Sequence, residues 1–208
     1  MPEKLNNESI ILTLAIIAAI LYNSWPLGYV LDPNALHNSY VSSLEVTGKP
    51  YAWLFIFADI LSGIAAVIIG FSIKKIKPQL RVSFIGYVAF GLATILEAVI
   101  PIASHCEESI SACGISPRQI LSPHDIASIV AAFSIFAILL SCKHQTRSNK
   151  IYKWVSITYW AWCITGLGLI VSVATDDLTT LAQALFLLAC GLGLVIVPIS
   201  LTKSKTIV

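Results

Sequence analysis

Four ionisable residues lie within, or at the start of, long apolar stretches of this sequence. Asp59 and Glu97 have apolar residues on both sides, and His124 and Asp125 begin a further apolar segment. Ionisable groups in such surroundings are costly and are candidates for proton transfer, ligand binding or metal coordination. Ser128 follows His124 by one helical turn and can serve as its hydrogen-bond partner. These five residues are the catalytic candidates.

Histidines add a possible metal site. His37, His105 and His124 are predicted to lie on the same side of the membrane, together with Asp59. These four residues are the metal-ligand candidates. Imidazole and carboxylate groups bind zinc, and zinc-bound water attacks esters and amides. The spacing matches no zinc signature, so no cofactor is predicted, and zinc enters only if the protein is a hydrolase.

The same acids also have structural interpretations. A buried carboxyl group can be protonated or can bond to hydroxyl groups such as those of Ser62, Thr94 and Tyr87. Asp125 follows Ser122-Pro123-His124, a typical helix start, and can cap that helix and complement its dipole. The sequence leaves functional and structural roles open for each residue, and the grouping of several acids favours a site.

The elements that must position these residues are membrane-spanning helices. Apolar residues make up 57% of the 208 residues and charged residues 12%, against about 25% charged in soluble proteins. A span needs about 20 mostly apolar residues. The sequence predicts an all-α, polytopic membrane bundle in which residues 1–208 form a single transmembrane domain. The six predicted spans are Ile10–Leu31, Tyr51–Ile73, Val82–Ala103, His124–Cys142, Tyr152–Ala174 and Leu178–Leu201.

Basic residues determine the predicted orientation. If the N-terminus is inside, only Lys49 and Arg118 of the 13 Lys and Arg residues lie outside, which leaves eleven on the cytoplasmic side. Cytoplasmic loops of membrane proteins carry such an excess of Lys and Arg. We therefore predict that both termini are cytoplasmic and that the protein lies in the plasma membrane.

This topology places the acids at similar depth beneath the external face. Asp59 is expected ~12 Å along its helix, and Glu97 ~6 Å from the outer end of the next one, at 1.5 Å per residue. Both acids share a helical face with small residues, which allow membrane helices to approach closely. The two stripes are Asp59, Gly63, Ala66 and Gly70, and Gly86, Phe90, Ala93 and Glu97. Both acids should therefore face the interior of the bundle.

Two cysteines share the predicted external loop after the third span. Six residues separate Cys106 from Cys113 in the sequence, and an oxidising exterior would favour a disulfide between the two cysteines. A metal pair formed with His105 is the alternative. Because this spacing is not a zinc signature, the disulfide is preferred.

The segment before the second span resembles a known family. It runs from His37 to Glu45, through Gly48-Lys49-Pro50-Tyr51-Ala52-Trp53-Leu54-Phe55, to Asp59. This run resembles a bacterial six-helix membrane family, the domain of unknown function numbered nine hundred and ninety-eight. Pro101, Cys106, Cys113 and His124 match further positions of that family loosely. The resemblance implies six helices and no established activity. A more distant resemblance to the Frag/DRAM/Sfk group adds no residue roles.

Function is predicted from the absence of a strong catalytic motif. The first hypothesis is a non-enzymatic accessory or sensory membrane protein with a polar cluster beneath its external face. The alternative is a metal-dependent membrane lipid hydrolase with ceramidase-like chemistry in that cluster. A proton-coupled carrier fits less well, because the two halves show no repeat. Expected partners are membrane lipids and either a membrane protein or a second copy of the chain, and nucleic acid is not expected.

Overall fold

Seven α-helices and one short 3-10 helix make up the part of the chain that the computed structural model describes, which is residues 2–32, 40–46, 48–100, 122–147, 150–175 and 178–203. In chain order the elements are α1 (Pro2–Tyr22), α2 (Pro26–Leu31), the 3-10 helix η1 (Val41–Glu45), α3 (Ala52–Ile76), α4 (Arg81–Val99), α5 (Pro123–Gln145), α6 (Tyr152–Thr175) and α7 (Thr179–Lys203). No strand occurs in these ranges, so the predicted all-α class is confirmed.

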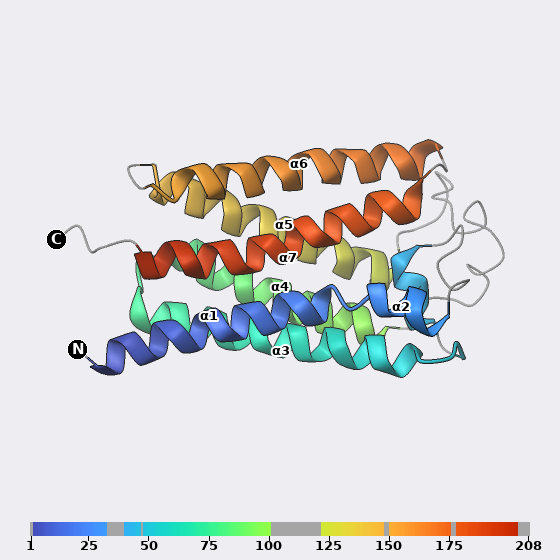
Figure 1. The fold of residues 1–208 in the computed structure, drawn as a ribbon, viewed down its shortest axis with the longest axis horizontal. Helices are drawn as coiled ribbons and strands as arrows, with labels where there is room; N and C mark the ends of the chain where they lie inside the picture. The colour runs from blue at the N-terminus through green and yellow to red at the C-terminus, as the bar shows by residue number, and fades with distance from the viewer. Residues whose placement is uncertain are drawn as a thin grey trace.

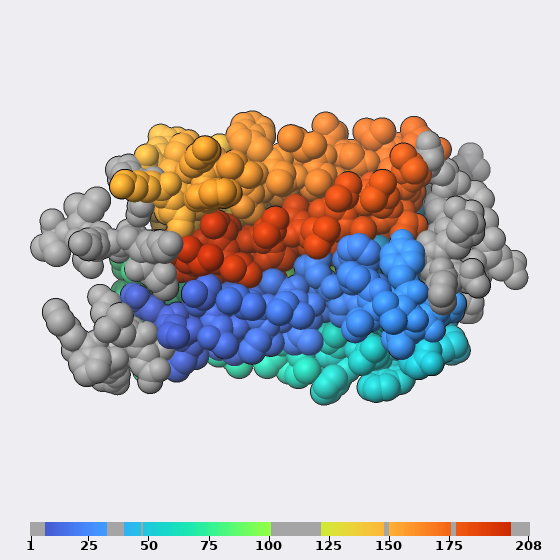
Figure 2. Space-filling view, in the orientation of Figure 1, coloured from blue at the N-terminus to red at the C-terminus, as the bar shows by residue number. Residues whose placement is uncertain are grey.

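The long helices run side by side in one bundle (Figure 1). The most extensive contacts join α3 to α4 and α4 to α5, and α1 packs against both α3 and α7. Figure 2 shows the atoms of α1 filling the space between α3 and α7 on one face of the molecule. The start of α1 and the end of α7 lie at one end of the bundle, and α2 and η1 lie at the other.

Five of the described helices, α3 to α7, are long and apolar enough to cross a membrane. Their outward surfaces carry large apolar side chains, such as Phe71, Leu92, Phe133 and Ile164, each more than half exposed. Such surfaces suit contact with lipid, which satisfies apolar groups and leaves backbone hydrogen bonds to the helix itself. The protein therefore has the helical architecture of a multi-pass membrane protein. Helix ends agree with the predicted spans within a few residues, except at the first.

The first predicted span, Ile10–Leu31, is not one continuous helix, and that prediction is wrong. Helix α1 ends at Tyr22, and α2 begins at Pro26. Proline cannot donate to the carbonyl one turn before it, and it is favoured at the first position of a helix. The Asn23 side chain also donates to Ala19 O at 3.0 Å, the carbonyl that the Asn23 backbone N–H uses. These local bonds end α1 at Tyr22, nine residues before the end of the predicted span at Leu31.

Small residues set the closest helix contact, between α3 and α4. A methyl group on Gly63 would lie 2.6 Å from Gly91 O, and one on Gly91 would clash with Gly63 O. Two hydroxyl groups then tie helices together across the bundle. Ser62 on α3 donates to Ala18 O of α1, and Tyr87 on α4 donates to Leu194 O of α7, both at 2.9 Å. The interior face predicted for both acid-bearing helices is thus confirmed.

The Gly63–Gly91 contact leads to a stability prediction. Gly91→Ala should lower the stability of the protein by roughly 1–3 kcal/mol, because the added methyl forces α3 and α4 apart. Gly168→Ala on α6 is the matched control, since its methyl would meet nothing within 4 Å. Thermal unfolding in detergent should show a lower Tm for Gly91→Ala alone. Equal Tm values for the two variants would contradict this packing.

Candidate functional site

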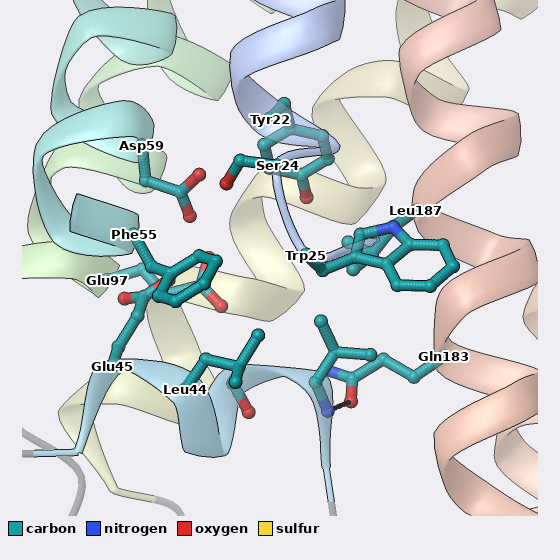
Figure 3. A pocket seen from close by; sticks show the side chains of 12 residues that line it. Tyr22, Ser24, Trp25, Leu44, Glu45, Phe55, Asp59, Glu97, Gln183 and Leu187 are labelled. Carbon is teal, nitrogen blue, oxygen red and sulfur yellow. Dashed lines mark hydrogen bonds between the residues drawn. The ribbon is translucent and has the colours of Figure 1, made fainter. Parts of the chain in front are cut away.

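A small cavity opens at the end of the bundle that carries α2 and η1 (Figure 3). The volume open to the centre of a water-sized sphere is about 40 Å³, which is room for a few water molecules. Asp59, Glu97 and Glu45 lie around the ring of Phe55 on one side, and Trp25 lies on the opposite side. The lining residues are Tyr22, Ser24, Trp25, Val41, Ser42, Leu44, Glu45, Phe55, Asp59, Glu97, Gln183 and Leu187.

The interruption between α1 and α2 creates one wall of this cavity. Tyr22 is the last residue of α1, and Ser24 and Trp25 lie in the turn that follows it. In one continuous helix these residues would follow the helix axis past the cavity. The turn instead brings the side chains of Tyr22, Ser24 and Trp25 to the cavity. Irregular backbone at such depth in a membrane protein is tolerated where it is buried in protein or lines a wet cavity.

The 3-10 helix η1 closes the cavity from outside the long helices. Leu44 packs with Phe55 of α3 and with Trp25. At the other end of η1, the Val41 N–H donates to Gln183 Oε1 of α7 at 2.7 Å. The side chain of Leu44 also lies directly over Gly28 of α2, where a methyl group would be 2.9 Å from it. Apolar packing and one polar contact therefore hold η1 on three helices.

Glu45, the last residue of η1, points inward and approaches the carboxyl group of Asp59 of α3 closely enough to exchange a hydrogen bond with it. Two carboxylates repel each other and cannot form such a bond, so this proximity favours a proton shared by the pair. Burial and the negative charge of Glu97 raise the pKa of Glu45 from 4.5 to about 7, against lowering effects from Asp59 and His124. The Glu45 Oε2 atom is buried and has no hydrogen-bond partner.

Glu97 joins this pair to the start of α5. Ser128 donates its hydroxyl to Glu97 Oε1 at 2.5 Å, and His124 Nε2 lies 3.7 Å from the same oxygen. The other ring nitrogen, His124 Nδ1, lies 3.1 Å from the carbonyl oxygen of Glu97. A carbonyl oxygen only accepts, so Nδ1 carries the proton and Nε2 faces the carboxyl group. The side chains of His124 and Glu97 are only 9% and 15% exposed.

The structure separates Asp125 from the cluster. Asp125 forms a capping box with Ser122, in which each side chain bonds to the backbone N–H of the other. This arrangement satisfies N–H groups that have no partner within the helix. Asp125 is exposed and does not line the cavity. The capping interpretation of this residue, left open by the sequence, is therefore the one the geometry supports.

Ser128 and the predicted hydroxyl partners differ in detail from expectation. Ser128 bonds to Glu97 and to the backbone O of His124 rather than to the imidazole ring. Ser62 and Tyr87 bond to backbone carbonyls of other helices, so neither satisfies Asp59 or Glu97. Ser128 bonds in this way because its hydroxyl group lies closer to the carboxyl group of Glu97 on α4 than to the imidazole ring of His124 on its own helix.

Other candidates fall elsewhere. His37, His105, Cys106 and Cys113 lie outside the described residues, and so do the disulfide and metal pair predicted from them. Within the described ranges, no group of three or more His, Cys, Asp or Glu residues is arranged to hold a metal ion. Asp59, Glu97, His124 and Ser128 do come together, as the topology predicted.

Glu45 is the residue that sequence reasoning missed. It lies between two predicted spans, so the sequence gives it no place in the cluster. A signal was present, since Val41, Leu44 and Val46 around it are apolar and all three are buried. Apolar side chains at this spacing in a loop indicate a segment that packs on the protein, and its acid is then carried inward.

Fold and site together define an all-helical membrane bundle with a buried carboxyl–histidine cluster at one end. The chain belongs to the family described as Protein of unknown function (DUF998), whose model matches residues 14–199. The match covers the last nine residues of α1, all of α2 to α6 and most of α7, and includes every described residue of the cluster. No curated protein and no solved structure matches the chain.

The tautomer of His124 is a direct prediction of this geometry. Nitrogen NMR of the protein labelled at histidine should show Nδ1 of His124 protonated at neutral pH, because Nδ1 faces a carbonyl oxygen that only accepts. The spectrum of His124→Gln identifies the signal by its loss, and His144→Gln, altered outside the cluster, serves as the control. A neutral ring protonated on Nε2 alone would contradict the contact with Glu97 O.

Proposed function

We propose that this protein is a non-enzymatic membrane sensor that responds to protonation of the Glu45–Asp59–Glu97–His124 cluster beneath its external face. The observation that carries the proposal is the close approach of Glu45, on an element outside the long helices, to Asp59, within one of them, in the lining of one cavity. This contact couples the charge inside the bundle to the position of a segment at its surface.

The direction of the response follows from the charge on Glu45. A pKa raised from 4.5 to about 7 means that the docked state of η1 prefers the protonated form. The difference disfavours the charged form by on the order of 3 kcal/mol. The stabilisation is complete below pH ~4.5 and is lost as the pH rises through about 7. Docking of η1 should therefore weaken in that range.

Every element around Glu45 contributes to this balance. Glu97 on α4 opposes a negative charge on Glu45, whereas Asp59 on α3, through hydrogen bonding, and His124 on α5 favour it. The phenol of Tyr22 on α1 also lines the cavity, and α7 contributes the neutral Gln183. Since acids outnumber the single histidine, loss of protons leaves a net repulsion between η1 and the bundle.

The proposal includes six spans, with both termini in the cytoplasm of a plasma-membrane protein. The start of α1 and the end of α7 lie at the same end of the bundle (Figure 1). Helices α3 and α5 carry Lys74, Lys75 and Lys143 in the last turns that reach this end. An excess of basic residues marks the cytoplasmic side. Helix α1 has 21 residues, enough to cross as a sixth span.

The hydrolase alternative draws no support from the described geometry. Its zinc would need ligands beyond Asp59 and His124, and the histidines predicted for that role, His37 and His105, lie outside the described residues. The Cys106–Cys113 disulfide stays a prediction for the same reason. Membrane lipids, and a membrane protein or a second copy of the chain, are the proposed partners.

The sensor proposal predicts a pH-dependent release of η1. Amide hydrogen exchange of residues 41–46, corrected for the intrinsic effect of pH, should accelerate in the full chain between pH 6 and pH 8. In Glu45→Gln the acceleration should vanish, because the amide side chain does not ionise yet has nearly the same shape. Mass spectrometry of the corresponding peptide measures both rates.

Asp125→Asn is the matched control for this experiment, since Asp125 is an acid at the same end that does not line the cavity. It should keep the pH dependence of the unmodified chain. Equal protection of residues 41–46 at both pH values, or an unchanged pH dependence in Glu45→Gln, would overturn the proposal.

A further inference from the structure

The lining of the cavity carries an excess of acidic over basic side chains, and protonation alone does not remove this excess. Three acids, Glu45, Asp59 and Glu97, line it, and the described lining contains no lysine or arginine. His124 reaches this group only through Glu97. The Glu45 Oε2 atom is buried against the cavity without any hydrogen-bond partner. Buried polar atoms without partners are rare in proteins and call for an explanation such as a bound group.

The charge of the lining selects a cation as the missing group. An anion would meet three acids, and a neutral molecule would leave the electrostatic cost of ionised acids unchanged. A positive charge within ~4–6 Å favours the ionised form of each carboxyl group. Phe55, Tyr22 and Trp25 add aromatic rings to the lining. Their faces attract cations within ~6 Å of the ring centre.

Geometry then separates a metal ion from an ammonium group. Oxygen ligands must approach Ca²⁺ to ~2.3–2.6 Å, and Mg²⁺ to ~2.0–2.1 Å, from several directions. The described residues offer no group of three acids, histidines or cysteines arranged in that way. An ammonium group instead donates up to three hydrogen bonds of ~2.7–2.9 Å, so it spans acids that are further apart.

The size of the cavity limits the ligand. About 40 Å³ of space for atom centres holds a few water molecules, and an ammonium nitrogen with one or two carbons needs a similar volume. A bulky or fully methylated amine would lack either the room or the N–H donors. The cavity is partly open, so a longer tail on the amine can extend out of it.

We infer that the cavity binds a primary ammonium group, which bridges Glu45 and Asp59 and packs against Phe55. This inference rests on the sensor proposed above and names the ligand class of its site. On binding, the cationic R–NH₃⁺ takes the place of the proton held between the two carboxyl groups, and that proton is released to solvent. The amine is either a free small amine or the headgroup of an ethanolamine phospholipid, and both present the same chemistry.

The test uses the full chain in mild detergent at neutral pH with methylammonium chloride as the probe. Calorimetric titration in two buffers of different ionisation enthalpy should show saturable binding with release of about one proton. Sodium chloride and tetramethylammonium chloride at the same concentrations should show neither. Equal heats for methylammonium and sodium, or equal binding of tetramethylammonium, would overturn the inference.

Variants locate the binding. Asp59→Asn and Glu45→Gln should each weaken methylammonium binding at least tenfold, whereas Asp125→Asn, with a carboxyl group that does not line the cavity, should bind as the unmodified chain does. Circular dichroism confirms folding of each variant, and the comparison of salts on the unmodified chain stands if one of them fails to fold. Undiminished binding in both folded variants would contradict the assignment.

The lipid arm identifies the source of the ammonium group. If the ligand is a lipid headgroup, phosphatidylethanolamine in nanodiscs should compete with methylammonium and phosphatidylcholine should not. If it is a free amine, neither lipid should compete; both results agree with an ammonium site. A failure of amine binding is distinguishable from failure of the sensor, because pH-dependent hydrogen exchange of residues 41–46 would persist without it.

Discussion

The close approach of the carboxyl groups of Glu45 and Asp59 is the interaction on which the site depends. It links the 3-10 helix η1 to α3, and it is favourable only while the pair shares a proton. Apolar contacts of Leu44 with Phe55 and Trp25 bring η1 to the bundle, but such packing is indifferent to pH. The carboxyl pair adds a dependence on charge. A surface element is thereby made sensitive to the state of a buried acid.

The break in the first helix makes this arrangement possible. A straight helix from Ile10 to Leu31 would have run past the cavity, whereas the turn at Asn23 sends α2 to a new position and leaves room beneath η1. Helix α1 still packs along α3 and α7 below the break. Close packing of Gly63 against Gly91 holds α3 to α4, so that Asp59 and Glu97 face the same space. Rigid helices thus support a cavity whose cover is one short segment.

Much of the fold could be predicted from the sequence, because apolar length and helical phase are local properties. The stretches that became α3 to α7 were apparent, and the small-residue stripes beside Asp59 and Glu97 placed both acids inside the bundle. The break after Tyr22 was missed because the prediction relied on the average hydropathy of Ile10–Leu31. That average does not reflect the individual hydrogen bonds that Asn23 and Pro26 change. A rule based on proline and side-chain competition would have found it.

The site was only partly predictable, for a different reason. The pairing of Glu97 with His124 follows from topology, since both lie at the same end of adjacent helices. The role of Glu45 depends on how a loop folds back onto the bundle, which no periodicity records. Likewise, the choice of Ser128 between His124 and Glu97 depends on distances across two helices. Long-range contacts of loops, rather than helix positions, limited the prediction.

The shared proton is tested most directly by infrared spectroscopy, which distinguishes a protonated carboxyl group from a carboxylate by its C=O stretching band. The account predicts a protonated-carboxyl band near neutral pH that weakens in Asp59→Asn and in Glu45→Gln but stays unchanged in Asp125→Asn. If no such band is present near neutral pH, or if it persists at full strength in both cavity variants, the proton does not lie between Glu45 and Asp59 and the account is contradicted.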